Sequence, residues 1–291
     1  MILLALLLAG TSGLSSAPIH DGDEDALREI SRQIELRGGD AELYLVRSNL
    51  FRQRGLLEFA LCDLDHALGL GAAPRRVALG RASVLHVQGR ETEAILQLDA
   101  LLVEDPTDAA ALVIRAGWRA ARGEVDASIA DYSRALELHP EPAGFLALAR
   151  LLVGRPGGEG ASQALECLES GIRALGPVPA LTGAALDIEI AAGDYGRALE
   201  RIDRMLQTAD RKEQLLFERG KVLSAAGRLD EAVVAQLDAL SAIGRLGPRH
   251  RQTARILELT EAVRIEIRSL SNELRRGSEL SDAEPGKEQR R

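Results

Sequence analysis

The sequence is poor in aromatic residues and in lysine, and it has no excess of positive charge. Only eight of its 291 residues are Phe, Tyr or Trp, three are lysines, and the formal net charge is −8. Proteins that hold nucleic acid combine a basic surface with aromatic side chains on which bases stack. The composition therefore argues against a nucleic-acid partner, while 46% hydrophobic and 27% charged residues are typical of a globular chain.

Cysteine is scarce as well. Cys62 and Cys167 are the only two, and neither has CxxC spacing or a neighbouring metal ligand. Both fall in expected helices three repeats apart, in the arrangement derived below. Packed helices lie about 8 to 10 Å apart, whereas a disulfide needs Cα atoms within about 7 Å. We therefore expect no internal disulfide and two buried, unreactive thiols.

The motifs of the common catalytic sites are missing, including GxSxG, HExxH and the Walker loop. Asp187 and Glu189 are close in sequence, but residues two apart point to different faces of a helix. A solvated helix face explains them better than an acid–base pair. Catalysis needs several polar groups that converge on one site, so we expect no enzymatic activity, no cofactor and no metal. The histidines are dispersed without metal-ligand spacing: His20, His66, His86, His139 and His250.

The N-terminal apolar run, Ile2 to Ala9, is too short to span a bilayer, which takes about 20 residues. With the small and polar residues that follow it, the run predicts a secretory signal peptide over residues 1–17. Thr11 stands where a bacterial lipoprotein has its lipidated cysteine, so we expect no lipid anchor. The prediction is an exported protein, periplasmic or extracellular. A mis-assigned start or a hydrophobic cap on the first helix is the alternative, and it would leave the protein in the cytoplasm.

Five glycines mark one position of an internal repeat. Gly55, Gly89 and Gly123 are 34 residues apart, and so are Gly193 and Gly227. A small residue follows each glycine after five positions, and further core positions come four and then three residues later. Residues at this spacing share one face of a helix. The small residues are Ala60, Ala94, Ser128, Ala198 and Ala232.

This pattern predicts helical hairpins. Alternating small and large residues lets two helices interlock, and the glycine supplies the turn between them, where a Cβ is costly. Pro106 and Pro140 restart the next unit, because proline is tolerated in a first helical turn but not in a helix interior. One hairpin cannot bury its apolar face alone, so neighbouring hairpins must stack.

The pattern resembles the tetratricopeptide repeat (TPR) family over most of the chain. The resemblance is clearest from Tyr44 to Ala67, from Ala116 to Pro140 and from Gly193 to Glu200. It implies an all-α fold, a right-handed superhelical α-solenoid of TPR helical hairpins with N- and C-terminal capping helices. The fourth repeat has a longer loop, Gly154 to Gly160, and the fifth has Leu186 at a small position. Six repeats are expected within 41–248, at residues 41–74, 75–108, 109–141, 142–178, 179–212 and 213–246.

Both ends fit the same scheme. Residues 23–38 carry Ala26, Ile30 and Ile34 in the frame of a second helix, which predicts an N-terminal capping half-repeat. Residues 249–275 are expected to form a C-terminal capping helix with an apolar stripe from Ile256 to Leu274. Residues 277–291 are charged and lack apolar spacing, so we predict a disordered tail.

The resemblance also implies a concave groove lined by the first helix of each repeat. Some TPR proteins clamp a C-terminal carboxylate there, but Leu45, Gly80, Ala110 and Ile114 occupy most of the clamp positions, so that clamp is absent. We expect an apolar or amphipathic peptide held by shape and by arginines at its margins. Alternatively, the small residues only let the superhelix close and leave nothing to bind. The candidate groove residues are Asn49, Arg52, Arg76, His86, Val113, Leu146, Arg150, Phe217 and Lys221.

One basic cluster lies just before and within the start of the expected C-terminal helix. It is either a patch for an acidic partner or lipid head group, or an exposed interhelix segment, and the acidic remainder of the chain favours the second interpretation. Its members are Arg245, Arg249, His250, Arg251 and Arg255.

The sequence and the resemblance together predict a non-enzymatic protein–protein interaction or scaffolding module of the bacterial envelope, which binds a peptide segment in its groove. An envelope assembly chaperone is one alternative. A cytoplasmic regulatory TPR module is another, if the N-terminal run is not a signal. The identity of the partner and the oligomeric state are left open.

Overall fold

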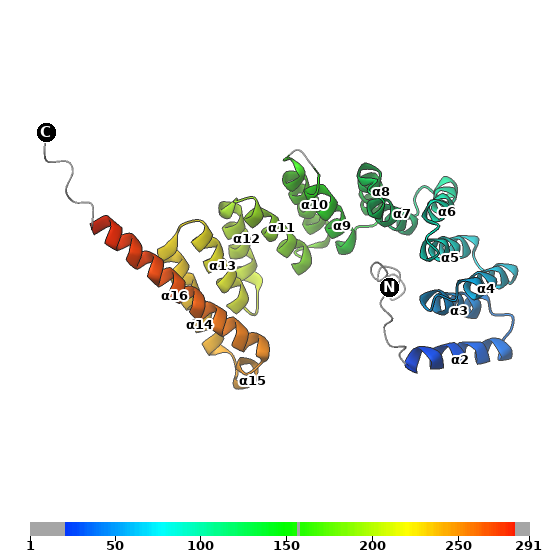
Figure 1. The fold of residues 1–291 in the computed structure, drawn as a ribbon, viewed down its shortest axis with the longest axis horizontal. Coiled ribbons are helices and arrows are strands. Elements are labelled where there is room, and N and C mark those ends of the chain that lie inside the picture. Colours follow the sequence, from blue (N-terminus) through cyan, green and yellow to red (C-terminus); the bar gives the residue numbers. More distant parts are fainter. Residues whose placement is uncertain (1–20, 156–157, 283–291) are drawn as a thin grey trace. The chain divides into compact units, whose positions relative to one another are not determined.

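The computed structural model describes residues 21–155 and 158–282, which form helices joined by turns, with no strand in these ranges (Figure 1). The expected signal peptide, residues 1–17, lies outside them. No helix in the described ranges combines the length and apolarity needed to cross a bilayer. The chain divides into two compact units, Met1–Asp131 and Tyr132–Arg291, and the boundary falls within helix α8 (Val125–Leu138).

Unit 1 is a stack of antiparallel helices in chain order. Each helix packs against the next one from α2 to α7, and α3 also contacts α5. One core cluster lies between α4 and α5 and contains Ala60, Leu64, Val77 and Val84. The helices are α2 (Asp21–Leu36), α3 (Ala41–Gln53), α4 (Leu57–Gly69), α5 (Pro74–Val87), α6 (Glu91–Glu104) and α7 (Ala109–Ala121).

Local sequence sets where these helices begin and end. Asp40 caps α3 by accepting the Glu42 backbone N–H at 3.0 Å, and Asp108 caps α7 by accepting that of Ala111 at 3.0 Å. Pro74 begins α5, where its missing N–H costs nothing. Gly55, Gly89 and Gly123 have φ of 73°, 74° and 79° and form the turns within the three hairpins. This left-handed conformation strains any residue with a Cβ.

Unit 2 continues the same construction. Helices pack pairwise along the chain from α9 to α14, and α9 also contacts α11. Gly193 and Gly227, with φ of 72° and 74°, form the turns before α12 and α14. The elements are α9 (Pro142–Val153), α10 (Gly160–Leu175), α11 (Pro179–Ala191), α12 (Tyr195–Thr208), α13 (Glu213–Ala225), α14 (Leu229–Arg245), α15 (Pro248–Arg251) and α16 (Ala254–Asp282).

The small residues after the turn glycines lie at helix contacts. Ala60, Ala94, Ser128, Ala198 and Ala232 are all 0% exposed. A side chain with no atoms beyond Cβ, or one as short as serine, lets two helix backbones approach closely. The five serve this role in both units, so each unit is an all-α stack of helical hairpins.

The C-terminal end differs from the expected single helix over 249–275. A one-turn helix, α15, comes first, and α16 begins at Ala254 and packs on α14 and α13. Helix α16 continues to Asp282, so residues 277–282, predicted as part of a disordered tail, are helical. Gly277 alone does not end the helix, because one glycine costs only about 1 kcal/mol relative to alanine and an existing helix propagates readily. Residues 283–291 lie outside the described residues.

Candidate functional site

The candidate groove residues all lie on the first helix of a hairpin. Unit 1 holds Asn49 and Arg52 on α3, Arg76 and His86 on α5, and Val113 on α7. In unit 2, Leu146 and Arg150 lie on α9, and Phe217 and Lys221 lie on α13. Arg150 and Lys221 are exposed, and the other seven are half-buried. We call the surface made by α3, α5 and α7 the first-helix face of unit 1.

Arg52 is a half-buried cation on this face. One of its terminal nitrogens donates a hydrogen bond to the Asn49 side-chain oxygen at 2.7 Å, which holds the guanidinium in place. Burial lowers the pKa of Arg52, and no carboxylate among the described residues lies within ion-pair distance of it. Buried charges are ordinarily paired, so this one lacks a counter-charge within the described chain.

His86 on α5 and Trp118 on α7 form a stacked pair on the first-helix face of unit 1. Their ring centroids are 4.5 Å apart and the ring planes differ by 13°. The His86 Nδ1 atom is buried and has no hydrogen-bond partner among the described residues. Burial lowers the pKa of His86, and the charge of Arg52 lowers it further, while Glu91 acts in the opposite direction.

Asn49, Arg52, His86 and Trp118 together come from three consecutive first helices, and we call them the Arg52 site. The repeat explains the arrangement, because Arg52 and His86 are 34 residues apart and occupy the same position of neighbouring hairpins. Trp118 was not among the predicted groove residues, since it lies two residues before the equivalent position of the third hairpin. Trp118 is the only tryptophan of a chain with few aromatic residues, and this rarity was the one signal in the sequence that could have pointed to it.

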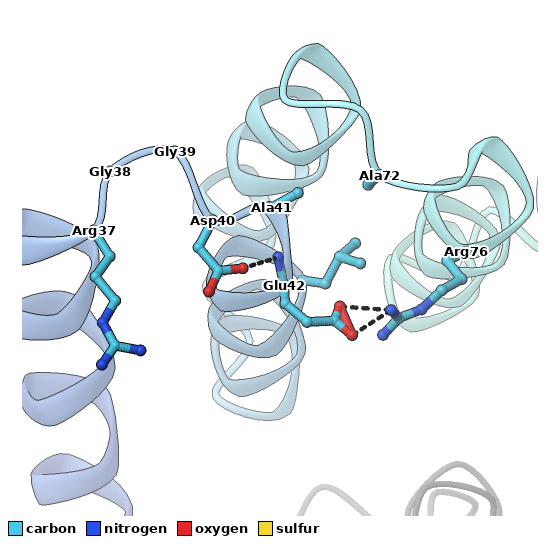
Figure 2. Close-up of a pocket in the computed structure, with 9 residues that line it drawn as sticks. Arg37, Gly38, Gly39, Asp40, Ala41, Glu42, Ala72 and Arg76 are labelled. Carbon is cyan, nitrogen blue, oxygen red and sulfur yellow. Dashed lines mark hydrogen bonds and ion pairs between the residues drawn. The ribbon is translucent and has the colours of Figure 1, made fainter.

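Arg76, which is predicted to hold a peptide at the groove margin, has an acidic partner within the chain. Its guanidinium pairs with the Glu42 carboxylate, 34 residues earlier on α3. The pair lines an open hollow of about 690 Å³. Figure 2 shows the pair, with Arg37 extending from the end of α2 on another side. Because Glu42 already neutralises Arg76, this guanidinium has less to gain from a ligand than that of Arg52.

The candidate residues of unit 2 form no comparable cluster. The Lys221 ammonium lies 5.6 Å from the centre of the Phe217 ring and pairs with Glu218 at 3.0 Å. Leu146 and Arg150 lie on another first helix, α9. The basic cluster, Arg245 to Arg255, is exposed at all five of its residues.

The structure contains a repeating set of ion pairs that was not predicted from the sequence. Arg47, Arg81 and Arg115 are 34 residues apart, and each reaches an aspartate 16 residues before or after it. These pairs join the helices of a hairpin or of neighbouring hairpins. Comparing charged residues across repeats, as well as apolar ones, would have revealed them. The pairs are Arg47 with Asp63, Arg81 with Asp65, and Arg115 with both Asp99 and Asp131.

Two expectations about single residues were wrong. Glu189, assigned to a solvated helix face, is 2% exposed and binds Arg201, whose Nε lies 2.9 Å from its Oε2 atom. The charge of Arg201 makes this burial possible, while Asp187 is exposed as expected. Cys62, expected to be buried, is exposed because its position on α4 faces solvent. Cys167 is half-buried, and burial raises the pKa of its thiol to about 11.

The described residues contain no group of three or more His, Cys, Asp or Glu side chains that could hold a metal ion. What the Arg52 site offers is a fixed guanidinium, an imidazole with an unused buried nitrogen, and a flat apolar ring. These groups suit recognition of another molecule through one acceptor and one apolar contact.

Comparison with protein-family models and with the sequences of curated proteins finds no match. Among solved structures, the C-terminal part of a TPR repeat-containing protein from Cytophaga hutchinsonii matches with a TM-score of 0.56 at 11% identity, over 82% of this chain and 94% of that one.

Two further structures match with lower TM-scores. A tetratricopeptide repeat protein from Parabacteroides merdae has a TM-score of 0.45 at 19% identity, over 83% of this chain and 92% of that one. Pseudomonas aeruginosa PilF has 0.48 at 19% identity, over 76% and 97%. The Cytophaga protein shares the stacked helical hairpins seen here. This likeness and the hairpins together show that this chain has the fold of the tetratricopeptide repeat proteins.

Proposed function

We propose that this chain is a non-enzymatic protein-binding module that holds a peptide segment of its partner against the first-helix face of unit 1. The observation that carries the proposal is the Arg52 guanidinium on α3, which is half-buried and has no carboxylate partner in the described chain, while the next two first helices carry the His86–Trp118 stack. An arginine with only a structural role is expected to have a charged partner. Arg47 on α3 and Arg115 on α7 are paired in this way with aspartates.

The stacked hairpins supply the surface for this role. Repeats of this kind present neighbouring helices side by side, and such surfaces bind extended or helical segments of other proteins. We further propose that the six helix pairs of residues 41–246 are six TPR repeats, flanked by α2 and α16 as caps. In this arrangement, position 12 of the first two repeats is occupied by Arg52 and His86.

We also propose that the protein acts in the bacterial envelope. The apolar run Ile2 to Ala9 supports export of a bacterial protein to the envelope, where the module would scaffold or assemble other proteins. Sequencing the N-terminus of the mature protein tests this part separately. A mature chain that begins near residue 18 supports export, and a retained Met1 contradicts it.

Site-specific photo-cross-linking tests the binding role. A photoreactive amino acid replaces Val87, which is 46% exposed and adjacent to His86, or Val103 on α6, which is 82% exposed and serves as the control. We expect a discrete adduct in the source cells from position 87 that disappears when Arg52→Gln is added, and none that depends on Arg52 from position 103. Adducts of equal yield at both positions, unaffected by Arg52→Gln, would refute the proposed face.

A further inference from the structure

The basic cluster at the end of unit 2 carries four guanidinium groups without a counter-charge. Arg245, Arg249, Arg251 and Arg255 are exposed, and none of them forms an ion pair with a described carboxylate. Arg245 donates one hydrogen bond, from Nε to a backbone oxygen of its own helix at 3.4 Å. Residues 239–257 contain no Asp or Glu, although the whole chain has a formal net charge of −8. Positive charge is therefore concentrated here and left unpaired.

The fold brings these arginines to one place. Ile243 near the end of α14 and Ile256 near the start of α16 belong to the same core cluster, so the two helix ends lie together. Helix α15 connects them, and Figure 1 shows it at the tip of unit 2 where α14 ends and α16 begins. Arg245 lies two residues after Ile243 on one side. Arg255 directly precedes Ile256 on the other side, and α15 carries the remaining two arginines. We call the four arginines the α15 tip.

Helix stability does not explain Arg255. It lies in the first turn of α16, where the positive end of the helix dipole disfavours a cation, and it gains no ion pair in return. Other helices of this chain place acids in their first turn, such as Asp230 and Glu231 on α14. Arg245 differs, because the last turn of α14 favours a cation. A residue that opposes its local structure without a partner inside the chain points to a partner outside it.

The chemistry of the α15 tip fits the phosphate groups of a membrane surface. A planar guanidinium donates two parallel hydrogen bonds to phosphate oxygens. Pro248 is exposed beside the arginines and Leu257 is 57% exposed, which provides apolar groups for the interfacial layer of a bilayer. A flat anionic surface needs to touch only the tip, and salt screens it from charges more than about 8 Å away. A polyanion laid along the chain would instead meet its acidic remainder.

We propose that the α15 tip, together with Leu257, binds the anionic phospholipid surface of a membrane. Four basic groups are the number at which polybasic surfaces recognise anionic lipids. The inference goes beyond the proposed function, since it concerns other helices and a different class of partner. It agrees with the proposed place of action, because a protein of the envelope lies next to a membrane. The α15 tip would then hold a protein-binding module at that membrane.

Vesicle co-sedimentation of the whole chain tests the inference. One set of vesicles contains phosphatidylcholine alone, and a second contains about one third phosphatidylglycerol, whose headgroup is anionic. Binding to the first set measures any contribution of the apolar run Ile2 to Ala9, so the difference between the sets reports the charged surface. The measurements are made at about 0.05 M and about 0.5 M salt, because exposed charges are screened at the higher concentration.

The test variant is Arg249→Gln/Arg251→Gln, which removes two exposed charges from the α15 tip. Arg90→Gln/Arg134→Gln is the matched control, since both of these arginines lie in exposed ion pairs and their removal changes the net charge equally. A third variant, Leu257→Ser, removes the apolar contact and keeps every charge. All five positions are exposed, so the variants should fold as the unaltered protein does.

We expect the unaltered protein to bind anionic vesicles at least about tenfold more tightly than neutral ones at low salt, and to lose this preference at high salt. Arg249→Gln/Arg251→Gln should weaken binding to anionic vesicles by at least about tenfold, and the control should leave it unchanged. Leu257→Ser should weaken it by a smaller factor. Equal binding to both sets of vesicles, or an equal loss in the two double variants, would overturn the inference.

An acidic segment of another protein is the competing partner for these arginines. A peptide of about ten glutamates is therefore titrated into the same three proteins. If this peptide bound in a manner that depends on Arg249 and Arg251 while the anionic vesicles did not bind, the partner would be a protein and the membrane inference would be wrong. The proposed function does not depend on the result, because the peptide-binding face is made by α3, α5 and α7.

Discussion

Replacing Arg201 by methionine is expected to destabilise the α11–α12 hairpin strongly. Arg201 on α12 and Glu189 on α11 are 5% and 2% exposed, and two hydrogen bonds of 2.9 and 2.6 Å join them. The hydrogen bonds of Arg201 to Glu189 and to Glu169 raise the pKa of Arg201 above its usual value. Methionine has a similar length and would fill the space, so the main effect is the loss of charge.

The size of the loss of stability depends on the two carboxylates that remain without Arg201. Glu169 is 38% exposed at its side chain and stays hydrated without Arg201, but Glu189 would be left as a buried carboxylate with no counter-charge. Breaking a buried ion pair on one side costs about 3 to 5 kcal/mol, while replacing both partners by apolar residues is often close to neutral. The double variant Arg201→Met/Glu189→Leu should therefore recover most of the stability that the single variant loses.

Urea unfolding followed by circular dichroism measures these differences, and hydrogen exchange of α11 and α12 shows whether the loss is local. Arg197→Met is the control on the same helix, because Arg197 pairs with Asp194 at the surface and such pairs contribute little. If Arg201→Met were no more destabilising than Arg197→Met, or if the double variant were as unstable as the single one, the buried-pair argument would fail.

Four further results are expected. Ala94→Leu should lower the free energy of unfolding by about 1 to 3 kcal/mol in a denaturant titration, because Ala94 is 0% exposed at a helix contact. Gly123→Ala should cost about 1 to 2 kcal/mol from its φ of 79° alone, since an added Cβ would meet no heavy atom within 4 Å. Mass spectrometry after brief alkylation at neutral pH should find Cys62 modified and Cys167 protected, because Cys62 is exposed and burial raises the pKa of Cys167 to about 11. Thermal unfolding between pH about 7 and about 5 should show a smaller acid-induced loss of stability in His86→Gln. The lowered pKa of His86 in the folded state means that the unfolded chain binds the proton first as the pH falls. An unchanged midpoint for Ala94→Leu or Gly123→Ala, equal labelling of both thiols, or an identical pH profile for His86→Gln would each contradict the corresponding argument.

The helices and their turns could be predicted because their signals are local. A glycine that must adopt positive φ, as at Gly55 or Gly227, and a small residue five positions later, as at Ala60 or Ala232, depend on backbone geometry within one hairpin. The 34-residue period then repeats that information along the chain. Helix ends were harder to place, as the extension of α16 past Gly277 shows.

The polar contacts could not be predicted because they depend on neighbours from other helices. The two-residue spacing correctly separated Asp187 from Glu189 onto different faces, but it could not show that Arg201, 12 residues later, turns toward Glu189. Arg52 and Arg76 looked equivalent in sequence, yet Glu42 neutralises only Arg76. The stacking of Trp118 on His86 likewise depends on two residues from different helices, α7 and α5.

Hydrogen exchange measured by mass spectrometry, with and without the peptide recovered from the Val87 adduct, tests the central claim most directly. If the first-helix face of unit 1 holds the partner, the peptide should slow exchange in α3, α5 and α7, and Arg52→Gln should abolish this protection. Protection confined to α4 and α6, or protection that persists unchanged in Arg52→Gln protein, would show that the partner binds elsewhere.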